Sequence, residues 1–244
     1  MKKIAYIILV LFMVSCYSDD NVPLVADEEA ILSTFIANKK FIKDNVIACA
    51  ASDEVSAGLI NVYFYPEAGA KDFKLYQSDG TDGNDFSKYQ FVKAVAQPFI
   101  DGTLQQFKVR SKVNWFVVVY MVDDTVKIST PIRSKVFSQP TVWNNAVTIN
   151  QEQMEMPQFN WPIADESLNA IFFQVVTTQN SEFLSGTYTH ENKFQYYKLN
   201  NVVLNVTNGT PPNLVSNNTY NFIVMDVSLD NWVNTVSSSS FVAN

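Results

Sequence analysis

Short apolar runs that are each ended by turn-forming residues restrict the fold of this sequence more than any other feature. Leu59–Tyr65 and Trp115–Val122 are two such runs, and they are followed by Pro66 and by the pair Asp123-Asp124. Runs of this kind recur at intervals of about 8–15 residues, which is typical of β-sandwiches. Hydrophobic residues make up 47% of the 244 positions, enough for a packed core. We therefore predict an all-β fold.

The pattern occurs twice along the chain. An aromatic run ends at Tyr65-Pro66 in the first half and at Trp161-Pro162 in the second half, and a further strand-like run follows each. Composition also changes, because only two lysines and no arginine follow residue 135. We predict two domains, at residues 46–139 and 140–244, each of the usual size for a β-sandwich.

The order of these features resembles tandem fibronectin type III or immunoglobulin-like domains. In such domains an early strand carries an aromatic residue before proline, and a late strand reads Tyr-x-apolar-x-apolar, as Tyr220, Phe222 and Val224 do here. The resemblance covers about residues 46–244. It implies two tandem β-sandwiches whose rigid cores leave the end loops free to carry binding residues.

The first 16 residues differ in pattern from the rest of the chain. Lys2 and Lys3 precede an uncharged, mostly apolar run at residues 4–14. As a helix this run would reach about 16 Å, roughly half of a bilayer core, so it is typical of a cleaved signal peptide. Met13-Val14-Ser15-Cys16 resembles the lipobox, with Met13 where Leu is usual. The resemblance implies a signal peptide at residues 1–15 and lipid attachment at Cys16.

The residues after Cys16 favour the cell surface. Ser18-Asp19-Asp20 resembles the export signal of surface lipoproteins in the Bacteroidota. We expect a lipid-anchored outer-membrane protein facing the cell exterior, with the periplasmic face as the alternative. Residues 16–45 are expected to form the lipidated N-terminus and a tether that contains one or two helical turns.

The charge of the chain limits its partners. Removing residues 1–15 takes two lysines and no acid from a chain of net charge −7, which leaves −9. A protein this acidic lacks the basic surface that binds nucleic acid. The expected partners are the membrane, through the lipid on Cys16, and a glycan or a protein.

Few residues carry the chemistry of a catalytic or metal site, and we predict no cofactor. His190 is the single histidine and lies in a polar stretch, so we expect an exposed loop residue. Cys49 is flanked by small and apolar residues, which indicates a buried thiol. No metal site is predicted, although a calcium ion in the loop from Asp79 to Asp85 stays open as an alternative.

The four tryptophans divide into two groups. Trp115 and Trp161 lie in strand-like runs and are expected in the core. Trp143 and Trp232 lie in loop-like segments, where they could stack on sugars or be partly buried at a seam between domains.

Together these features favour a non-enzymatic surface lipoprotein that acts as a binding or interaction module. Its partner would be a glycan, a host protein or a component of an outer-membrane complex. One alternative is an extracellular hydrolase that uses two carboxylates, for which Glu182 and Glu191 are candidates without a motif. An enzyme of that kind should have a pocket in which acids of shifted pKa converge. A purely structural spacer is the third possibility.

Overall fold

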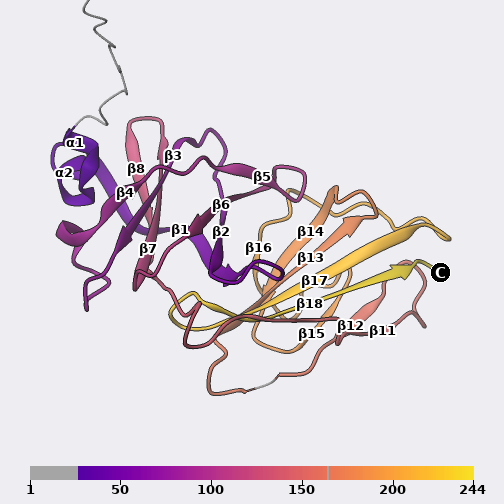
Figure 1. Cartoon of the computed structure of the whole chain (residues 1–244). Coiled ribbons are helices and arrows are strands. Elements are labelled where there is room, and N and C mark those ends of the chain that lie inside the picture. Colours follow the sequence, from indigo (N-terminus) through magenta and orange to yellow (C-terminus); the bar gives the residue numbers. More distant parts are fainter. Residues whose placement is uncertain (1–26, 164) are drawn as a thin grey trace, which may run out of the picture.

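The computed structural model describes residues 27–163 and 165–244, and it confirms the prediction of an all-β fold for them (Figure 1). The predicted signal peptide, Cys16 and the rest of residues 1–26 lie outside the described residues. We refer to residues 27–139 as the N-terminal unit and to the described residues of 140–244 as the C-terminal unit.

Each unit contains nine strands, and the N-terminal unit also contains three short helices. The N-terminal unit comprises α1 (Asp27–Ala30), α2 (Leu32–Ile36), β1 (Lys40–Ser52), β2 (Leu59–Tyr65), β3 (Lys71–Ser78), η1 (Phe86–Lys88), β4 (Gln90–Val92), β5 (Gln97–Phe99), β6 (Leu104–Arg110), β7 (Trp115–Val122), β8 (Thr125–Ser129) and β9 (Ile132–Arg133). The C-terminal unit comprises β10 (Val142–Asn144), β11 (Thr148–Asn150), β12 (Gln158–Asn160), β13 (Ile171–Thr178), β14 (Phe183–Thr189), β15 (Lys193–Gln195), β16 (Val202–Asn205), β17 (Thr219–Val227) and β18 (Val233–Val242).

Strand β1 joins the two layers of the N-terminal unit. Residues 40–42 pair in parallel with β8, whereas residues 47–52 pair in antiparallel with β2. The register shifts between Ile42 and Val46, and Asp44 has a left-handed φ of 56°. A bulge of this kind bends a strand and lets it pass from one sheet to the other. One layer therefore has the order β4-β3-β7-β8 and the other the order β1-β2-β6-β5.

The side chains of β2 serve two cores, because successive residues of a strand point to opposite faces. Ile60, Val62 and Phe64 pack inside the sandwich against residues such as Phe116 of β7. Tyr63 belongs to a different cluster, on the opposite face of the same sheet. Both faces of this sheet are thus covered.

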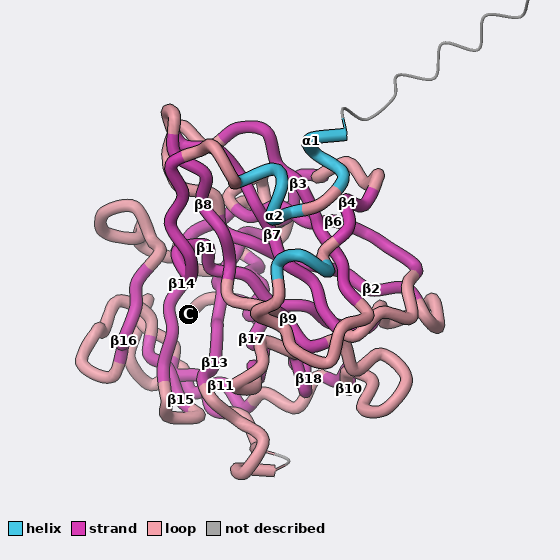
Figure 2. The backbone as a smooth tube through the Cα atoms, turned by 90° about the vertical axis from the view of Figure 1, so that its left-hand side faces the viewer, coloured by secondary structure: helices cyan, strands magenta, loops and turns pink. Residues whose placement is uncertain are grey.

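Helices α1 and α2 cover the outer face of the β3–β7 layer (Figures 1 and 2). Leu32, Phe35 and Ile36 are buried there with Tyr76, whose hydroxyl donates to the Glu29 carbonyl at 3.1 Å. The prediction of a tether at residues 16–45 is therefore corrected for residues 27–45. They fold with the N-terminal unit because α2 buries its apolar side chains on the sheet and β1 already begins at Lys40.

The C-terminal unit is also a sandwich. Its larger layer has the order β10-β18-β17-β13-β14-β16, and its smaller layer the order β11-β12-β15. Between them, the Phe159 ring of β12 stacks on the Phe222 ring of β17 with centroids 3.9 Å apart. Trp161 meets Phe172 edge to face at 5.3 Å.

The strand order confirms the expected immunoglobulin- or fibronectin type III-like sandwich. In the N-terminal unit, β1-β2-β6-β5 and β3-β7-β8 follow the A-B-E-D and C-F-G orders of that architecture. In the C-terminal unit, Tyr220 near the start of β17 accepts a hydrogen bond from the Val215 backbone N–H at 2.8 Å. In immunoglobulin-like sandwiches the tyrosine corner is a contact of this kind at the start of strand F. Strand β17 takes the place of strand F here, between β13 and β18.

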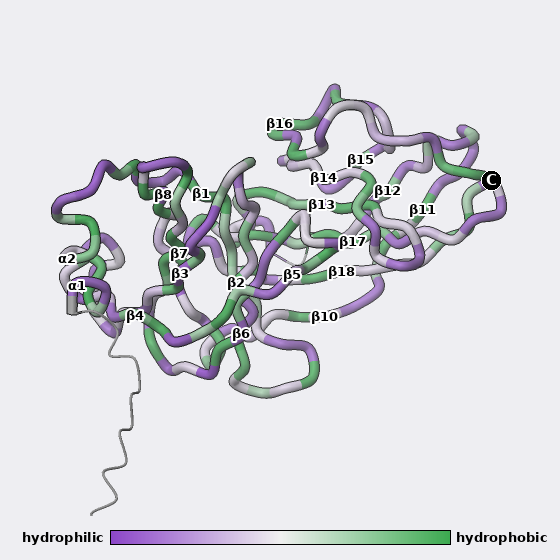
Figure 3. Tube along the Cα trace, turned by 90° about the horizontal axis from the view of Figure 1, so that it is seen from above, coloured by the Kyte–Doolittle hydropathy of each residue, from purple (hydrophilic) through white to green (hydrophobic). Residues whose placement is uncertain are grey.

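The two units pack sheet against sheet (Figure 3). Tyr63 and Leu104 of the N-terminal unit share one apolar cluster with Phe173, Met225 and Val236 of the C-terminal unit. A core of this kind between two sandwiches resists rigid-body movement of one against the other.

The segment that joins β17 to β18 ties the units further. Trp232 is fully buried in the core of the N-terminal unit, and its indole N–H donates to the Gln139 carbonyl at 2.8 Å. The Ala50 backbone N–H donates to the Asn231 carbonyl at 3.0 Å. A domain boundary at residue 140 would separate Trp232 from the core in which it is buried. The division into two domains at this position stays a prediction.

Candidate functional site

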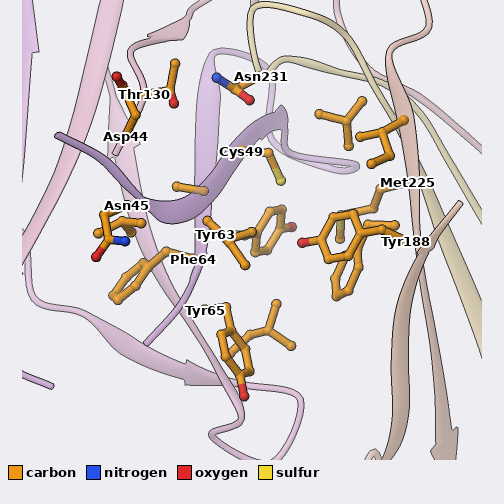
Figure 4. Close-up of a pocket in the computed structure, with 17 residues that line it drawn as sticks. Asp44, Asn45, Cys49, Tyr63, Phe64, Tyr65, Thr130, Tyr188, Met225 and Asn231 are labelled. Atoms are coloured by element: carbon orange, nitrogen blue, oxygen red, sulfur yellow. The ribbon is translucent and has the colours of Figure 1, made fainter. Parts of the chain in front are cut away.

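A cavity of about 300 Å³ lies between the facing sheets of the two units (Figure 4). Strands β1 and β2 form one wall, and β13, β14 and β17 form the other. Its volume is at the lower end of the range for small-molecule sites, which often lie at domain interfaces.

The cavity has apolar walls and a polar rim. The apolar wall residues come from both units and include Ile47, Leu104, Ile171, Phe173, Met225 and Val227. The rim includes Asp44, Asn45 and Thr130, all exposed to solvent. The bulge of β1 places Asp44 and Asn45 there, so the strand that joins the two layers also shapes the opening.

Three polar groups face the interior, namely the hydroxyls of Tyr63 and Tyr188 and the thiol of Cys49 (Figure 4). Burial raises the pKa of Cys49 to about 12. Burial also raises the pKa of Tyr63, and a hydrogen bond with the Asn61 side chain opposes this rise to a smaller extent. Burial raises the pKa of Tyr188 well above its ordinary value. All three groups are therefore neutral at physiological pH and are available as hydrogen-bond donors.

The aromatic neighbours of the two tyrosines fix their rings. Tyr188 stacks on Phe173 with centroids 4.5 Å apart and planes at 24°. Tyr63 lies against Phe99 at 4.7 Å. The hydroxyls are thus held in place from opposite walls of the cavity before any ligand binds.

Cys49 departs in part from its prediction as a buried apolar residue. It is enclosed by protein atoms, but its side chain lines the cavity and is half-buried rather than sealed in the core. Cys16 lies outside the described residues, so lipid attachment stays a prediction. His190 is exposed beyond the end of β14, as predicted, with its Nδ1 3.1 Å from the Ala170 carbonyl oxygen.

The loop from Asp79 to Asp85 uses its carboxylates to bind its own backbone. Asp82 accepts from the Asn84 N–H at 2.8 Å, and Asp85 accepts from the Ser87 N–H at 3.1 Å. The Trp115 ring lies so close to Gly83 that a Cβ there would approach it to 2.8 Å. Within residues 27–163 and 165–244, no group of three or more acidic, histidine or cysteine side chains gathers as a metal site would require.

The tryptophans are structural. Trp161 is buried in the core of the C-terminal unit, as predicted. Trp115 is only half-buried at the start of β7, where its indole N–H donates to the Gly80 carbonyl at 3.1 Å. Trp143 and Trp232 lie at the junction of the units, and the Trp143 indole N–H donates to the Ser52 carbonyl at 3.0 Å. The seam position is confirmed for both.

The two acids suggested for a hydrolase do not converge. Glu182 and Glu191 lie at opposite ends of β14, whose seven residues span about 23 Å, whereas a glycosidase needs its carboxylates about 5–10 Å apart. Glu191 pairs with Lys193 at 2.8 Å, and this neighbour lowers its pKa. A general acid requires the opposite shift.

Comparison with known proteins assigns no family. No family model and no curated protein matches the chain. The chain resembles the crystal structure of the chicken CNTN1 FN1-FN3 domains with a TM-score of 0.31 and 8% identity, over 84% of this chain and 68% of that chain. A likeness this weak carries no argument, so the fold class rests on the strand order. Within the described part of the chain, no helix has the length and hydropathy needed to cross a bilayer.

Sequence reasoning did not identify Tyr63 and Tyr188 as site residues. One signal was present, because the run Val62-Tyr63-Phe64-Tyr65 is apolar or aromatic at every position. Such a run indicates that both faces of the strand are covered. It does not indicate what covers the second face or that a cavity remains there.

Proposed function

We propose that this protein is a non-enzymatic binding protein of the bacterial cell surface, anchored through lipid on Cys16. The binding part rests on the cavity between the units, with its apolar walls and neutral donors. A thiol with a pKa near 12 is not a nucleophile at neutral pH, and protonated tyrosines are not bases. These groups can hold a ligand but are poorly suited to attack one.

The anchoring part rests on the signal peptide pattern and the lipobox resemblance at residues 13–16. Helix α1, where the described residues begin, lies on the side of the N-terminal unit away from the C-terminal unit (Figure 1). An anchor attached upstream would hold the N-terminal unit nearer the membrane and the C-terminal unit farther out. Glycans or partner proteins, which are too large for the cavity, would meet the loops of the outer unit.

A protease-shaving experiment tests the anchor and the membrane face. The native chain and a Cys16→Ala variant are expressed in a bacteroidotal host, and intact cells are treated with protease and blotted. We expect the native chain to be membrane-bound and shaved, and the variant to be released. Cys49→Ala is the matched control, because it removes the other cysteine and should stay membrane-bound.

Two outcomes would contradict this proposal. A native chain that is membrane-bound but protected from protease would face the periplasm. A Cys16→Ala variant that fractionates like the native chain would exclude lipid on Cys16 as the anchor.

A further inference from the structure

We infer that the cavity between the units takes a small, uncharged and largely apolar molecule with an oxygen acceptor, to which Tyr63 and Tyr188 donate hydrogen bonds. The inference rests on the proposed binding function and adds a ligand class to it.

The volume sets the size of the ligand. About 300 Å³ corresponds to the bulk volume of roughly ten water molecules. That is room for a fused pair of rings or a short branched chain, but not for an oligosaccharide or a peptide.

The walls set the polarity of the ligand. Among the residues that line the cavity, Asp44 is the single charged side chain, and it is exposed at the rim. A charged ligand buried against Leu104, Phe173 and Met225 would lose its hydration without gaining a partner of opposite charge. An uncharged, largely apolar molecule loses nothing comparable and gains apolar contact on both sides.

The two tyrosines set the position of the acceptor. The residues Tyr63 and Tyr188 are only 4% and 9% exposed, and their hydroxyl oxygens reach the cavity, since neither is among the buried polar atoms that lack a partner in the described chain. In Figure 4 the two hydroxyls point toward one another from opposite walls. A single carbonyl or hydroxyl oxygen of a ligand lying between them would satisfy both.

The dye prodan is a suitable probe, since it is an uncharged naphthalene ketone whose emission shifts to the red when its carbonyl accepts hydrogen bonds. It is titrated into the chain that begins at residue 16 and carries Cys16→Ala, which keeps every described residue. We expect saturable binding with one dye per chain. We also expect bound prodan to emit at longer wavelength than prodan in an apolar solvent, because both tyrosines donate to its ketone.

Variants locate the dye. Tyr63→Phe and Tyr188→Phe remove only the hydroxyl, and each should weaken binding by about three- to tenfold and shift the emission to the blue. Cys49→Leu enlarges a side chain that lines the cavity and should abolish binding. Tyr196→Phe is the matched control. The Tyr196 hydroxyl donates a hydrogen bond to the Pro212 carbonyl at the core of the C-terminal unit, away from the cavity, so its loss should leave prodan binding unchanged.

Three results would overturn the inference. They are the lack of saturable prodan binding, equal binding by all variants, and equal affinity for 2-dimethylaminonaphthalene, which lacks the ketone. If a variant does not fold, the protein with the unchanged cavity still tests the inference. Bound prodan should slow alkylation of Cys49 by iodoacetamide, and an unchanged rate would contradict binding in the cavity. The assay uses purified protein, so its result does not depend on where the protein is anchored.

Discussion

At the residue scale, Cys49 illustrates how the environment changes a side chain that looks ordinary in the sequence. Its neighbours in β1 alternate between two cores, with Ala48 and Ala50 packed towards one and Ile47 and Cys49 towards the other. The thiol therefore faces the cavity while protein atoms surround it. The resulting desolvation raises its pKa to about 12.

This pKa predicts slow alkylation of Cys49 in the folded protein. With the Cys16→Ala variant at pH 8, iodoacetamide should react with Cys49 about a thousandfold more slowly in the folded than in the urea-unfolded chain, because the pKa rises from 9.0 to about 12 and the thiolate is the reactive form. Mass spectrometry of timed samples measures both rates. Equal rates would contradict the buried, protonated thiol.

The same shift has a consequence for stability. The folded thiol keeps its proton, whereas the unfolded thiol loses it above about pH 9. Its contribution to the free energy of unfolding is therefore complete below pH 9 and is lost as the pH rises towards 12. The buried tyrosines act in the same direction. Cys49→Ala should therefore reduce, without removing, the fall in unfolding free energy at alkaline pH.

At the scale of elements, the packing of α2 on the sheet is the clearest departure from expectation, because helical turns were expected there only as part of a tether. This packing can be tested. Phe35→Ala should lower the free energy of unfolding by about 3 kcal/mol, since the ring is buried against the β3–β7 layer and its loss leaves a cavity. Glu28→Ala, at an exposed position of α1, should have little effect. Urea denaturation measures both variants. Equal stabilities would mean that α2 does not pack as described.

Elements whose own sequence favours a strand were predictable, and those that depend on tertiary pairing were not. The expected strands Leu59–Tyr65 and Trp115–Val122 have the observed bounds. Strands β5, β10 and β14 were not expected. The first two have only three residues each, and β14 contains Gly186, which disfavours strands.

The candidate site could not be predicted from the sequence for the same reason. Tyr188 lies in β14, which forms by pairing with β13 and β16, and Tyr63 lies in a strand that was predicted correctly. Local pattern shows that a strand is buried, but it does not show which distant strand buries it. The cavity exists only where β2 of one unit faces β13 and β14 of the other.

At the scale of the whole molecule, the described chain is a stack of layers. The helices cover the β3–β7 layer, the β1–β2–β6 layer follows, and the two layers of the C-terminal unit complete the stack. The cavity lies in the middle of this stack. Its two walls belong to different units, so its shape depends on how firmly the units hold together.

This packing predicts one cooperative unfolding transition instead of two. The units share an apolar cluster, and Trp232 of one is buried in the core of the other. Unfolding either unit alone would expose both surfaces to water. Differential scanning calorimetry should therefore give a single peak whose calorimetric and van't Hoff enthalpies agree.

Trp232→Ala tests the coupling directly. Removal of this fully buried indole should destabilise the protein by about 3–5 kcal/mol and move the whole transition to lower temperature. Leu229→Ala lies three residues away in the same β17–β18 connection but is 88% exposed, so it should leave the midpoint unchanged. Two resolved peaks in the unsubstituted protein, or a variant in which only part of the unfolding enthalpy shifts, would mean that the units fold independently. In that case the tyrosines that line the cavity would not be held in fixed positions.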